Sequence, residues 1–158
     1  MITHIKGKLV EKSPTSVIID VNGIGYLINI SLNTFSAIPD QENLKLYTHL
    51  QIKEDSHTLF GFYSLKEREI FRLLISVSGI GASIARTMLS SLTPEQIIQG
   101  ISIGDSAMIQ SVKGIGLKTS QRVIIELKDK VLKLVDKIIL DNADASVELI
   151  IKEALKNL

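Results

Sequence analysis

The sequence contains no cysteine and no tryptophan, and only 4% of its 158 residues are aromatic. Without cysteine there is no disulfide framework, no thiol nucleophile and no cysteine-ligated metal, so we expect a reducing, cytoplasmic setting. No apolar run approaches the roughly 18 residues that a membrane span requires. The first residues, MITHIKGKLVEK, also contain no apolar stretch like that of a secretory signal, so no membrane association is expected.

Recognisable catalytic and metal-binding motifs are missing as well. The three histidines, His4, His49 and His57, do not have the H-E-x-x-H spacing of a zinc site. Neither a G-x-x-x-x-G-K-[ST] phosphate loop nor a G-x-S-x-G nucleophile elbow occurs. We therefore expect no cofactor, no metal and no catalytic residues, and the chain is not predicted to be an enzyme by itself.

The formal net charge is only +1, which alone argues against a nucleic-acid-binding protein. The charge is unevenly distributed, however. Residues 63–134 carry 10 Lys and Arg against 6 Asp and Glu, whereas residues 1–62 carry 5 against 6 and residues 135–158 carry 3 against 5. A local basic excess is what displaces counterions from phosphates, although a scatter of solvated charges explains this count equally well.

The first part of the chain is predicted to form β-strands. Residues 16–21 are a β-branched run, Asn22 and the glycine after it supply a tight turn, and residues 26–31 resume the pattern, which is typical of a hairpin. Further strand candidates are residues 2–10, 44–51 and 58–63. About five short strands in about 60 residues favour a small closed barrel such as the OB-fold.

The rest of the chain is predicted to be helical. Ser64 with Glu67, and Thr93 with Gln96, have the spacing of capping boxes that begin helices. A longer helix is expected from about Lys118 to Lys133. The polar residues 140–145 are interpreted as a linker, after which Ser146 would cap a final helix.

That final helix has an apolar stripe at the spacing of one helical face. The stripe comprises Val147, Ile150, Ile151, Ala154, Leu155 and Leu158. Such a stripe belongs either to a core or to a partner surface, and little chain remains nearby to cover it. We interpret Val147, Ile150, Ile151 and Leu155 as candidate partner-binding residues.

The most informative feature is an internal repeat with an offset of 35 residues. Residues 74–89 match residues 109–124, and each copy has a Gly-Ile-Gly turn between two predicted helices. Glycine accepts the positive φ of a tight turn without steric cost. Each turn leads into a helix N-terminus, where unpaired N–H groups and the positive end of the helix dipole favour a phosphate.

The repeat is similar to tandem helix-hairpin-helix motifs, which bind the DNA backbone without reading its sequence. The candidate contacts of the first copy are Gly79, Ile80, Gly81, Ala82, Ser83 and Arg86. Those of the second copy are Gly114, Ile115, Gly116, Leu117, Lys118 and Arg122. Lys118 and Arg122 lie one helical turn apart and would add side-chain contacts to phosphates, although a solvated helix face is the alternative for this pair.

The whole arrangement resembles the RuvA family of bacterial Holliday-junction-binding proteins, over at least residues 1–134. The matching features are Gly7, Glu11 with Lys12, residues 21–26, residues 53–55, residues 59–62, Glu67 with Arg68 ahead of Phe71, both hairpins and residues 126–129. The expected fold class is α+β multidomain: an OB-fold barrel over residues 1–63, a tandem helix-hairpin-helix domain over 64–134, and a short C-terminal helical segment over 135–158.

The resemblance implies a homotetramer, or an octamer of two tetramers, that holds four-way junction DNA open. Glu54 and Asp55 match the acidic pin that such proteins project into the junction centre, and Lys53 lies beside them. On sequence alone these residues are only a polar hairpin tip. The barrel is implied to carry the tetramer contacts, and the implied partner is RuvB, a ring ATPase that drives branch migration in recombination and repair.

The chain departs from the family at its C-terminal part. After Lys133 only 25 residues follow, where the family has a long linker and a complete helical bundle that contacts RuvB. Residues 135–158 are therefore interpreted as a remnant of that bundle. This shortening puts coupling to RuvB in doubt, whereas junction binding is expected to persist.

Two other functions remain open at this point. The chain can be a general helix-hairpin-helix DNA- or RNA-binding protein without junction specificity. It can also be a nuclease or glycosylase that uses the hairpins to dock DNA. That function requires clustered carboxylates or a catalytic lysine or aspartate beside a hairpin, and Glu54 with Asp55 is too little.

Overall fold

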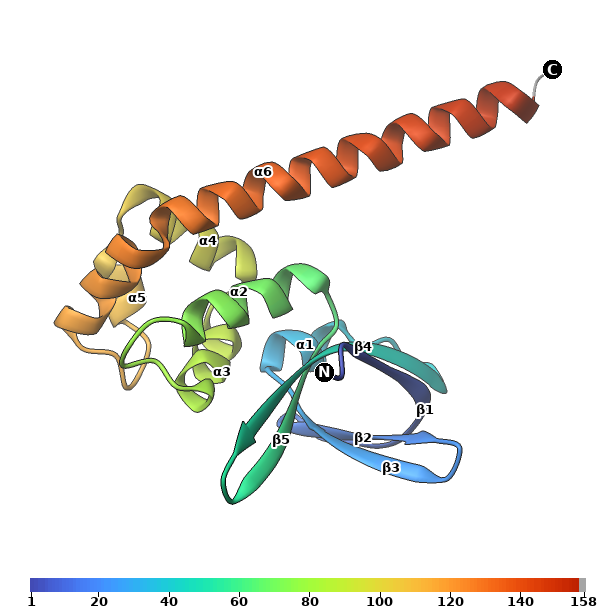
Figure 1. The fold of residues 1–158 in the computed structure, drawn as a ribbon, viewed down its shortest axis with the longest axis horizontal. Helices are drawn as coiled ribbons and strands as arrows, with labels where there is room; N and C mark the ends of the chain where they lie inside the picture. Colours follow the sequence, from blue (N-terminus) through green and yellow to red (C-terminus); the bar gives the residue numbers. More distant parts are fainter. Residues whose placement is uncertain (157–158) are drawn as a thin grey trace.

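The computed structural model describes residues 1–156, and for residues 141–150 it describes the backbone alone. Five strands form a barrel, and a group of helices follows it (Figure 1). The strands are β1 (His4–Lys12), β2 (Ser16–Val21), β3 (Ile24–Asn29), β4 (Asn43–Lys53) and β5 (Ser56–Phe62). The helices are α1 (Leu32–Ala37), α2 (Leu65–Ile75), α3 (Ala82–Ser91), α4 (Pro94–Ile103), α5 (Ser106–Gln110) and α6 (Leu117–Lys156). Within residues 1–156, no helix is both long and apolar enough to cross a membrane.

The barrel is closed in the order β1-β2-β3-β5-β4, with β4 pairing back onto β1. Only β3 and β5 pair in parallel, which is the arrangement of a five-stranded OB-type barrel. The predicted hairpin between β2 and β3 turns at Asn22 and Gly23, which have φ values of 53° and 91°. The predicted fold class, an OB-type barrel followed by a helical domain, is therefore confirmed.

The barrel and the helices form one packed unit. Phe60 and Phe62 of β5 belong to the core of the helical part, where their rings lie 5.1 and 4.9 Å from the ring of Phe71 in α2. The barrel has its own interior core, formed by Ile5, Val17, Ile19, Ile28, Ile30, Ile38, Leu44 and Leu46. Leu59 of β5 packs against this barrel core, so β5 contacts both cores, and the aromatic contacts of Phe60 and Phe62 hold the helices against the barrel.

The two predicted capping boxes have different outcomes. Thr93 and Gln96 exchange both expected hydrogen bonds at the start of α4, so that box is confirmed. At the start of α2 the Ser64 hydroxyl accepts from the N–H of Glu67, but the Glu67 side chain does not return to the cap. It turns instead toward α1, a short helix that the sequence did not predict.

The predicted linker over residues 140–145 is wrong. α6 runs without a break from Leu117 to Lys156, and Figure 1 shows it extending far beyond the other helices. Ser146 therefore lies within a helix and does not begin one. Residues 117–156 contain neither glycine nor proline, and a few interior Asp, Asn and Ser residues each cost less than about 1 kcal/mol in helix propensity. The polar residues within 140–145 were therefore not enough to end the helix.

Candidate nucleic-acid interface

The two Gly-Ile-Gly turns have the same backbone geometry. Gly79 and Gly114 both have a φ of 96°, a value that strains any other residue type. In each copy the N–H of the following isoleucine donates to a carbonyl three residues earlier: Ile80 to Val77 at 3.1 Å, and Ile115 to Val112 at 3.2 Å. The 35-residue sequence repeat is therefore also a structural repeat, and the prediction of tandem helix-hairpin-helix motifs is confirmed.

Each turn leads directly into a helix N-terminus. Gly81 is the N-cap of α3, where no side chain accepts from the first N–H groups, and Gly116 precedes α6. Neither helix has an acidic residue in its first turn. Both N-termini therefore present backbone donors and a positive dipole end without a carboxylate to neutralise them, which favours an anion.

The second glycines of the two turns are Gly81 and Gly116, and no contact within this chain requires glycine at either position. Gly81 has φ −87° and ψ 173°, which any residue adopts. A Cβ atom added at Gly81 or at Gly116 would meet no atom within 4 Å. The space beside these two positions is therefore open, so that another molecule can approach the backbone closely.

The isoleucine of each turn contributes only its backbone to this surface. Ile80 and Ile115 are 4% and 6% exposed, and their side chains anchor the turns in the helical core. Ala82 is also buried, whereas Ser83, Leu117 and Lys118 are exposed. Of the predicted side-chain contacts in the second copy, Lys118 and Arg122 are both open to solvent.

The two turns lie next to each other. Arg122 of α6 donates through Nη1 to the carbonyl of Ser78, the residue before Gly79, at 3.2 Å. A Cβ added at Gly79 would lie 3.6 Å from Oγ1 of Thr119 in the first turn of α6. The sequence repeat did not reveal this contact, which joins the two candidate anion sites into one surface.

Arg86 is placed differently from the other predicted contacts. It is half-buried in α3, and its Nη1 donates to Oδ1 of Asn29 in β3 at 3.2 Å. The side chain therefore contacts the barrel, and the sequence contained no signal for this contact between residues 57 positions apart.

The predicted acidic tip lies at the turn between β4 and β5. These strands pair continuously from Tyr47 opposite Phe62 to Lys53 opposite Ser56. Lys53, Glu54 and Asp55 are all exposed. Figure 1 shows this turn projecting from the barrel, so the structure places two carboxylates at the end of a stiff, paired ribbon.

Glu67 of α2 is a buried carboxylate that faces α1, and sequence reasoning missed its partners there. Glu67 accepts hydrogen bonds from the hydroxyls of Ser31 and Thr34, the latter at 2.8 Å. Burial raises the pKa of Glu67, and the two hydroxyl donors partly oppose that effect. Thr34 also accepts from the N–H of Tyr63 at 3.2 Å, so this cluster joins α1, α2 and the end of β5.

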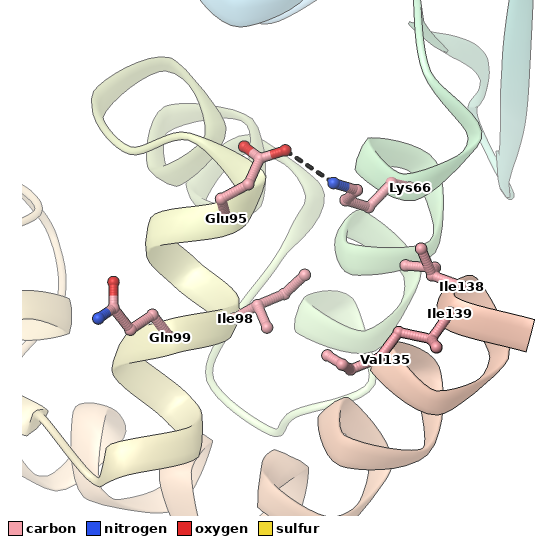
Figure 2. A pocket seen from close by; sticks show the side chains of 7 residues that line it. All are labelled: Lys66, Glu95, Ile98, Gln99, Val135, Ile138 and Ile139. Atoms are coloured by element: carbon pink, nitrogen blue, oxygen red, sulfur yellow. Dashed lines mark hydrogen bonds and ion pairs between the residues drawn. The ribbon is translucent and has the colours of Figure 1, made fainter. Parts of the chain in front are cut away.

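Helix α6 packs against α4, and Val135, Ile138 and Ile139 of α6 face the space beside it. A hollow of about 230 Å³ lies there, and Figure 2 shows the side chains that line it: Lys66, Glu95, Ile98, Gln99, Val135, Ile138 and Ile139. Lys66 and Glu95 form an ion pair of 2.8 Å at its edge, and the hydrogen bond from Lys66 lowers the pKa of Glu95. Farther along α6, the predicted partner-binding residues Ile151 and Leu155 are 53% and 63% exposed, while the side chains of Val147 and Ile150 lie outside those described.

Among the described residues, no group of three or more His, Asp or Glu side chains is placed to hold a metal ion. Glu54 and Asp55 therefore stand as an acidic pair at an exposed tip. The surface built by the described residues consists of two open helix N-termini, exposed basic side chains on α6, and a separate acidic turn.

The fold and this surface define a class: proteins in which an OB-type barrel is fused to a tandem helix-hairpin-helix domain. A family model described as RuvA N terminal domain matches residues 1–61, and one described as SAM-like Helix-hairpin-helix tandem matches residues 71–129. A Flavobacterium psychrophilum protein described as Holliday junction branch migration complex subunit RuvA is 54% identical over 193 residues, with all of both chains covered. The chain belongs to the RuvA family.

Two further relatives carry the same description. The protein from Christiangramia forsetii is 53% identical over 193 residues, again with all of both chains covered. The protein from Cytophaga hutchinsonii is 56% identical over 133 residues, which cover 84% of this chain and 67% of that one.

The longer alignments contain more positions than this chain has residues. The alignment with the Flavobacterium psychrophilum protein spans 193 positions, 35 more than the 158 residues of this chain. Because both chains are fully covered, the unmatched positions lie within the aligned span. This observation supports the interpretation that a segment of the relatives has no counterpart here.

Proposed function

We propose that this chain is a non-catalytic, structure-specific subunit that binds four-way (Holliday) junction DNA and holds it open for branch migration. The single observation that carries the proposal is the pair of adjacent Gly-Ile-Gly turns with identical φ at Gly79 and Gly114 and with open space at Gly81 and Gly116. Two such turns fixed on one domain suit successive phosphates of a DNA backbone. The description of the relatives as branch migration complex subunits supports the same function.

The proposed roles of the two hairpin turns and of the β4–β5 tip follow from their charges. The backbone donors at both turns, with Ser83, Lys118 and Arg122, bind phosphates without reading bases. Glu54 and Asp55 at the β4–β5 tip repel phosphates at the junction centre, which guides the exchanging strands apart and disfavours a continuous duplex. Attraction at the hairpins combined with repulsion at the tip selects a branched substrate over a linear one.

We propose that the active species is a homotetramer, in which four copies of the acidic tip meet at the centre. The outer surface of the barrel supports this, because Val10 of β1 and Leu27 of β3 are each 59% exposed. A second copy of the chain would cover these apolar side chains. Light scattering at micromolar concentration tests this: a tetramer or an octamer of two tetramers supports it, and a monomer contradicts it.

We propose further that ATP hydrolysis is supplied by RuvB and that residues 135–158 are the part of the chain that contacts it. Two observations support a protein contact at this end: Ile151 and Leu155 are exposed, and they share an apolar sequence stripe with Val147 and Ile150. Truncation after Leu134 should leave junction binding intact and abolish stimulation of the motor on junction DNA. Equal stimulation by the truncated and intact chains would contradict this assignment.

The experiment for the central function is a gel-shift titration with a four-way junction and with linear duplexes of the same arm sequences. The proposal predicts tighter binding of the junction, with no change when the arm sequences are shuffled. Equal affinity for junction and duplex would favour the general helix-hairpin-helix DNA-binding function instead. Mg²⁺-dependent cleavage of the junction would favour the nuclease function.

A further inference from the structure

Arg86 joins α3 to a strand of the barrel. Its Nη1 donates to Oδ1 of Asn29 at 3.2 Å, and Nδ2 of the same Asn29 donates to the carbonyl of Leu59 in β5 at 3.4 Å. The side-chain amide of Asn29 therefore accepts one hydrogen bond through Oδ1 and donates another through Nδ2. One chain of hydrogen bonds runs from α3 through β3 to β5.

The two ends of this chain lead to the two parts of the proposed interface. Arg86 lies one helical turn after Ala82, about 6 Å along α3 from the first hairpin. Leu59 lies on β5 four residues from Asp55, about 13 Å along the ribbon that ends in the acidic tip. The contact between Arg86 and Asn29 therefore links the first hairpin to the element that carries Glu54 and Asp55.

The C-terminal end of α3 is attached separately to α1, the helix that follows β3. Asn33 of α1 donates through Nδ2 to the carbonyl of Leu92 at 2.8 Å and also to that of Leu89. The N–H of Leu32 donates to Oγ of Ser90 at 3.1 Å. Because α3 is held at its end and again near its middle, both its position and its direction relative to the barrel are fixed.

Comparison of the two repeat copies separates Arg86 from the candidate phosphate contacts. With the 35-residue offset, Lys118 corresponds to Ser83 and Arg122 corresponds to Thr87. Arg86 corresponds to Gln121, one position before Arg122 and therefore about 100° around the helix. Arg86 thus lies on the side of α3 that contacts the barrel, whereas Ser83 and Thr87 are exposed.

We propose that Arg86 is a positioning residue and not a phosphate contact: through Asn29 it fixes the first hairpin relative to the acidic tip, and this fixed geometry contributes to selectivity for branched over linear DNA. The inference rests on the proposed function. Linear duplex needs only the hairpins, whereas a junction must satisfy the hairpins and the tip together. Loosening the attachment should therefore weaken junction binding selectively.

The test is a double-mutant cycle with Arg86→Met and Asn29→Ala, which remove opposite ends of the same hydrogen bond. Dissociation constants for a four-way junction and for linear duplex are measured over a salt series, and thermal unfolding is followed for each variant. Lys118→Ala is the matched control, because Lys118 is an exposed basic residue at the equivalent helix of the second copy.

The expected result is a loss of junction affinity of about tenfold for either variant, with duplex affinity within about twofold of the wild type. The double variant should be no weaker than Asn29→Ala alone, because Asn29→Ala already removes the hydrogen bond to Arg86 as well as the one to the Leu59 carbonyl. The slope of log K against log salt should be unchanged for Arg86→Met, whereas Lys118→Ala should reduce it and weaken binding to both DNAs.

Three results would overturn the inference. One is a reduced salt slope for Arg86→Met, which would make Arg86 a phosphate contact. Another is additive losses in the double variant, and the third is junction binding unchanged in both single variants. If the wild type itself bound junction and duplex equally, the proposed function would fail first. Because Asn29→Ala leaves Arg86 in place, a folding defect of Arg86→Met still leaves one variant that tests the contact.

Discussion

Substitutions at Gly81 and Gly116, the second glycines of the two turns, can test DNA binding separately from stability. We predict that Gly81→Ala and Gly116→Ala weaken DNA binding without destabilising the fold. A methyl group at either position meets no atom of this chain within 4 Å, and the backbone of Gly81 has an ordinary conformation. The added methyl groups would occupy the space through which a phosphate approaches the helix N–H groups.

The size of the effect follows from the interaction that is lost. A hydrogen bond from a backbone N–H to a charged phosphate contributes about 1.5–3 kcal/mol, so each substitution should raise Kd by about 10- to 150-fold. For stability two small terms oppose each other. Alanine is a poorer N-cap than glycine, but it restricts the unfolded chain, and each effect is at most about 1 kcal/mol.

Gly79→Ala is the matched control, because it lies two residues away but has a φ of 96°. Alanine at this backbone angle should cost about 1–2 kcal/mol and lower Tm by about 2–8 °C. Binding is measured by fluorescence anisotropy with labelled junction DNA, and stability by thermal unfolding. Wild-type affinity in both Gly81→Ala and Gly116→Ala would refute the argument that these glycines admit a phosphate.

Three further predictions concern the tip, the buried carboxylate and a helix cap. Replacing Glu54 by Gln together with Asp55 by Asn should preserve junction binding in a gel shift but change the rate of motor-driven branch migration; loss of all binding would mean that the pair is structural. Burial raises the pKa of Glu67 above its usual 4.5, so as pH rises from about 4.5 through the folded-state pKa, the unfolded chain releases this proton first and stability falls. In urea titrations across that window, the free energy of unfolding of the wild type should therefore fall as pH rises, relative to that of Glu67→Gln. A difference between the two free energies that does not change with pH would contradict the burial argument. Thr93→Ala should lose about 0.5–2 kcal/mol of stability by removing the cap of α4, with a smaller loss for Gln96→Ala, and equal stability of wild type and Thr93→Ala in thermal unfolding would show that this cap contributes nothing.

Local sequence signals predicted the local structure well. Asn22 with Gly23 predicted the β2–β3 turn because few residue types accept positive φ at both turn positions. The 35-residue repeat predicted two hairpins of equal geometry because the same glycines sit between the same apolar residues. The OB-type barrel followed from strand spacing alone, since short strands that cannot leave their edges open favour closure.

Long-range contacts between side chains were not predictable in this way. The sequence assigned Glu67 to a capping box, but the hydroxyls of Ser31 and Thr34, over 30 residues away, provide its partners. Arg86 was assigned to DNA by its proximity to the first hairpin, whereas its bond to Asn29 depends on how the barrel packs. Polarity favoured a linker over residues 140–145, but without glycine or proline the helix continues.

The most direct test of the central claim is an equilibrium competition experiment. A labelled four-way junction bound to the wild-type chain is titrated with unlabelled junction or with unlabelled linear duplex of the same arm sequences, at one fixed salt concentration. The combination of two open helix N-termini and an acidic tip predicts displacement by unlabelled junction at a much lower concentration than by duplex. Displacement by both at the same concentration would contradict it.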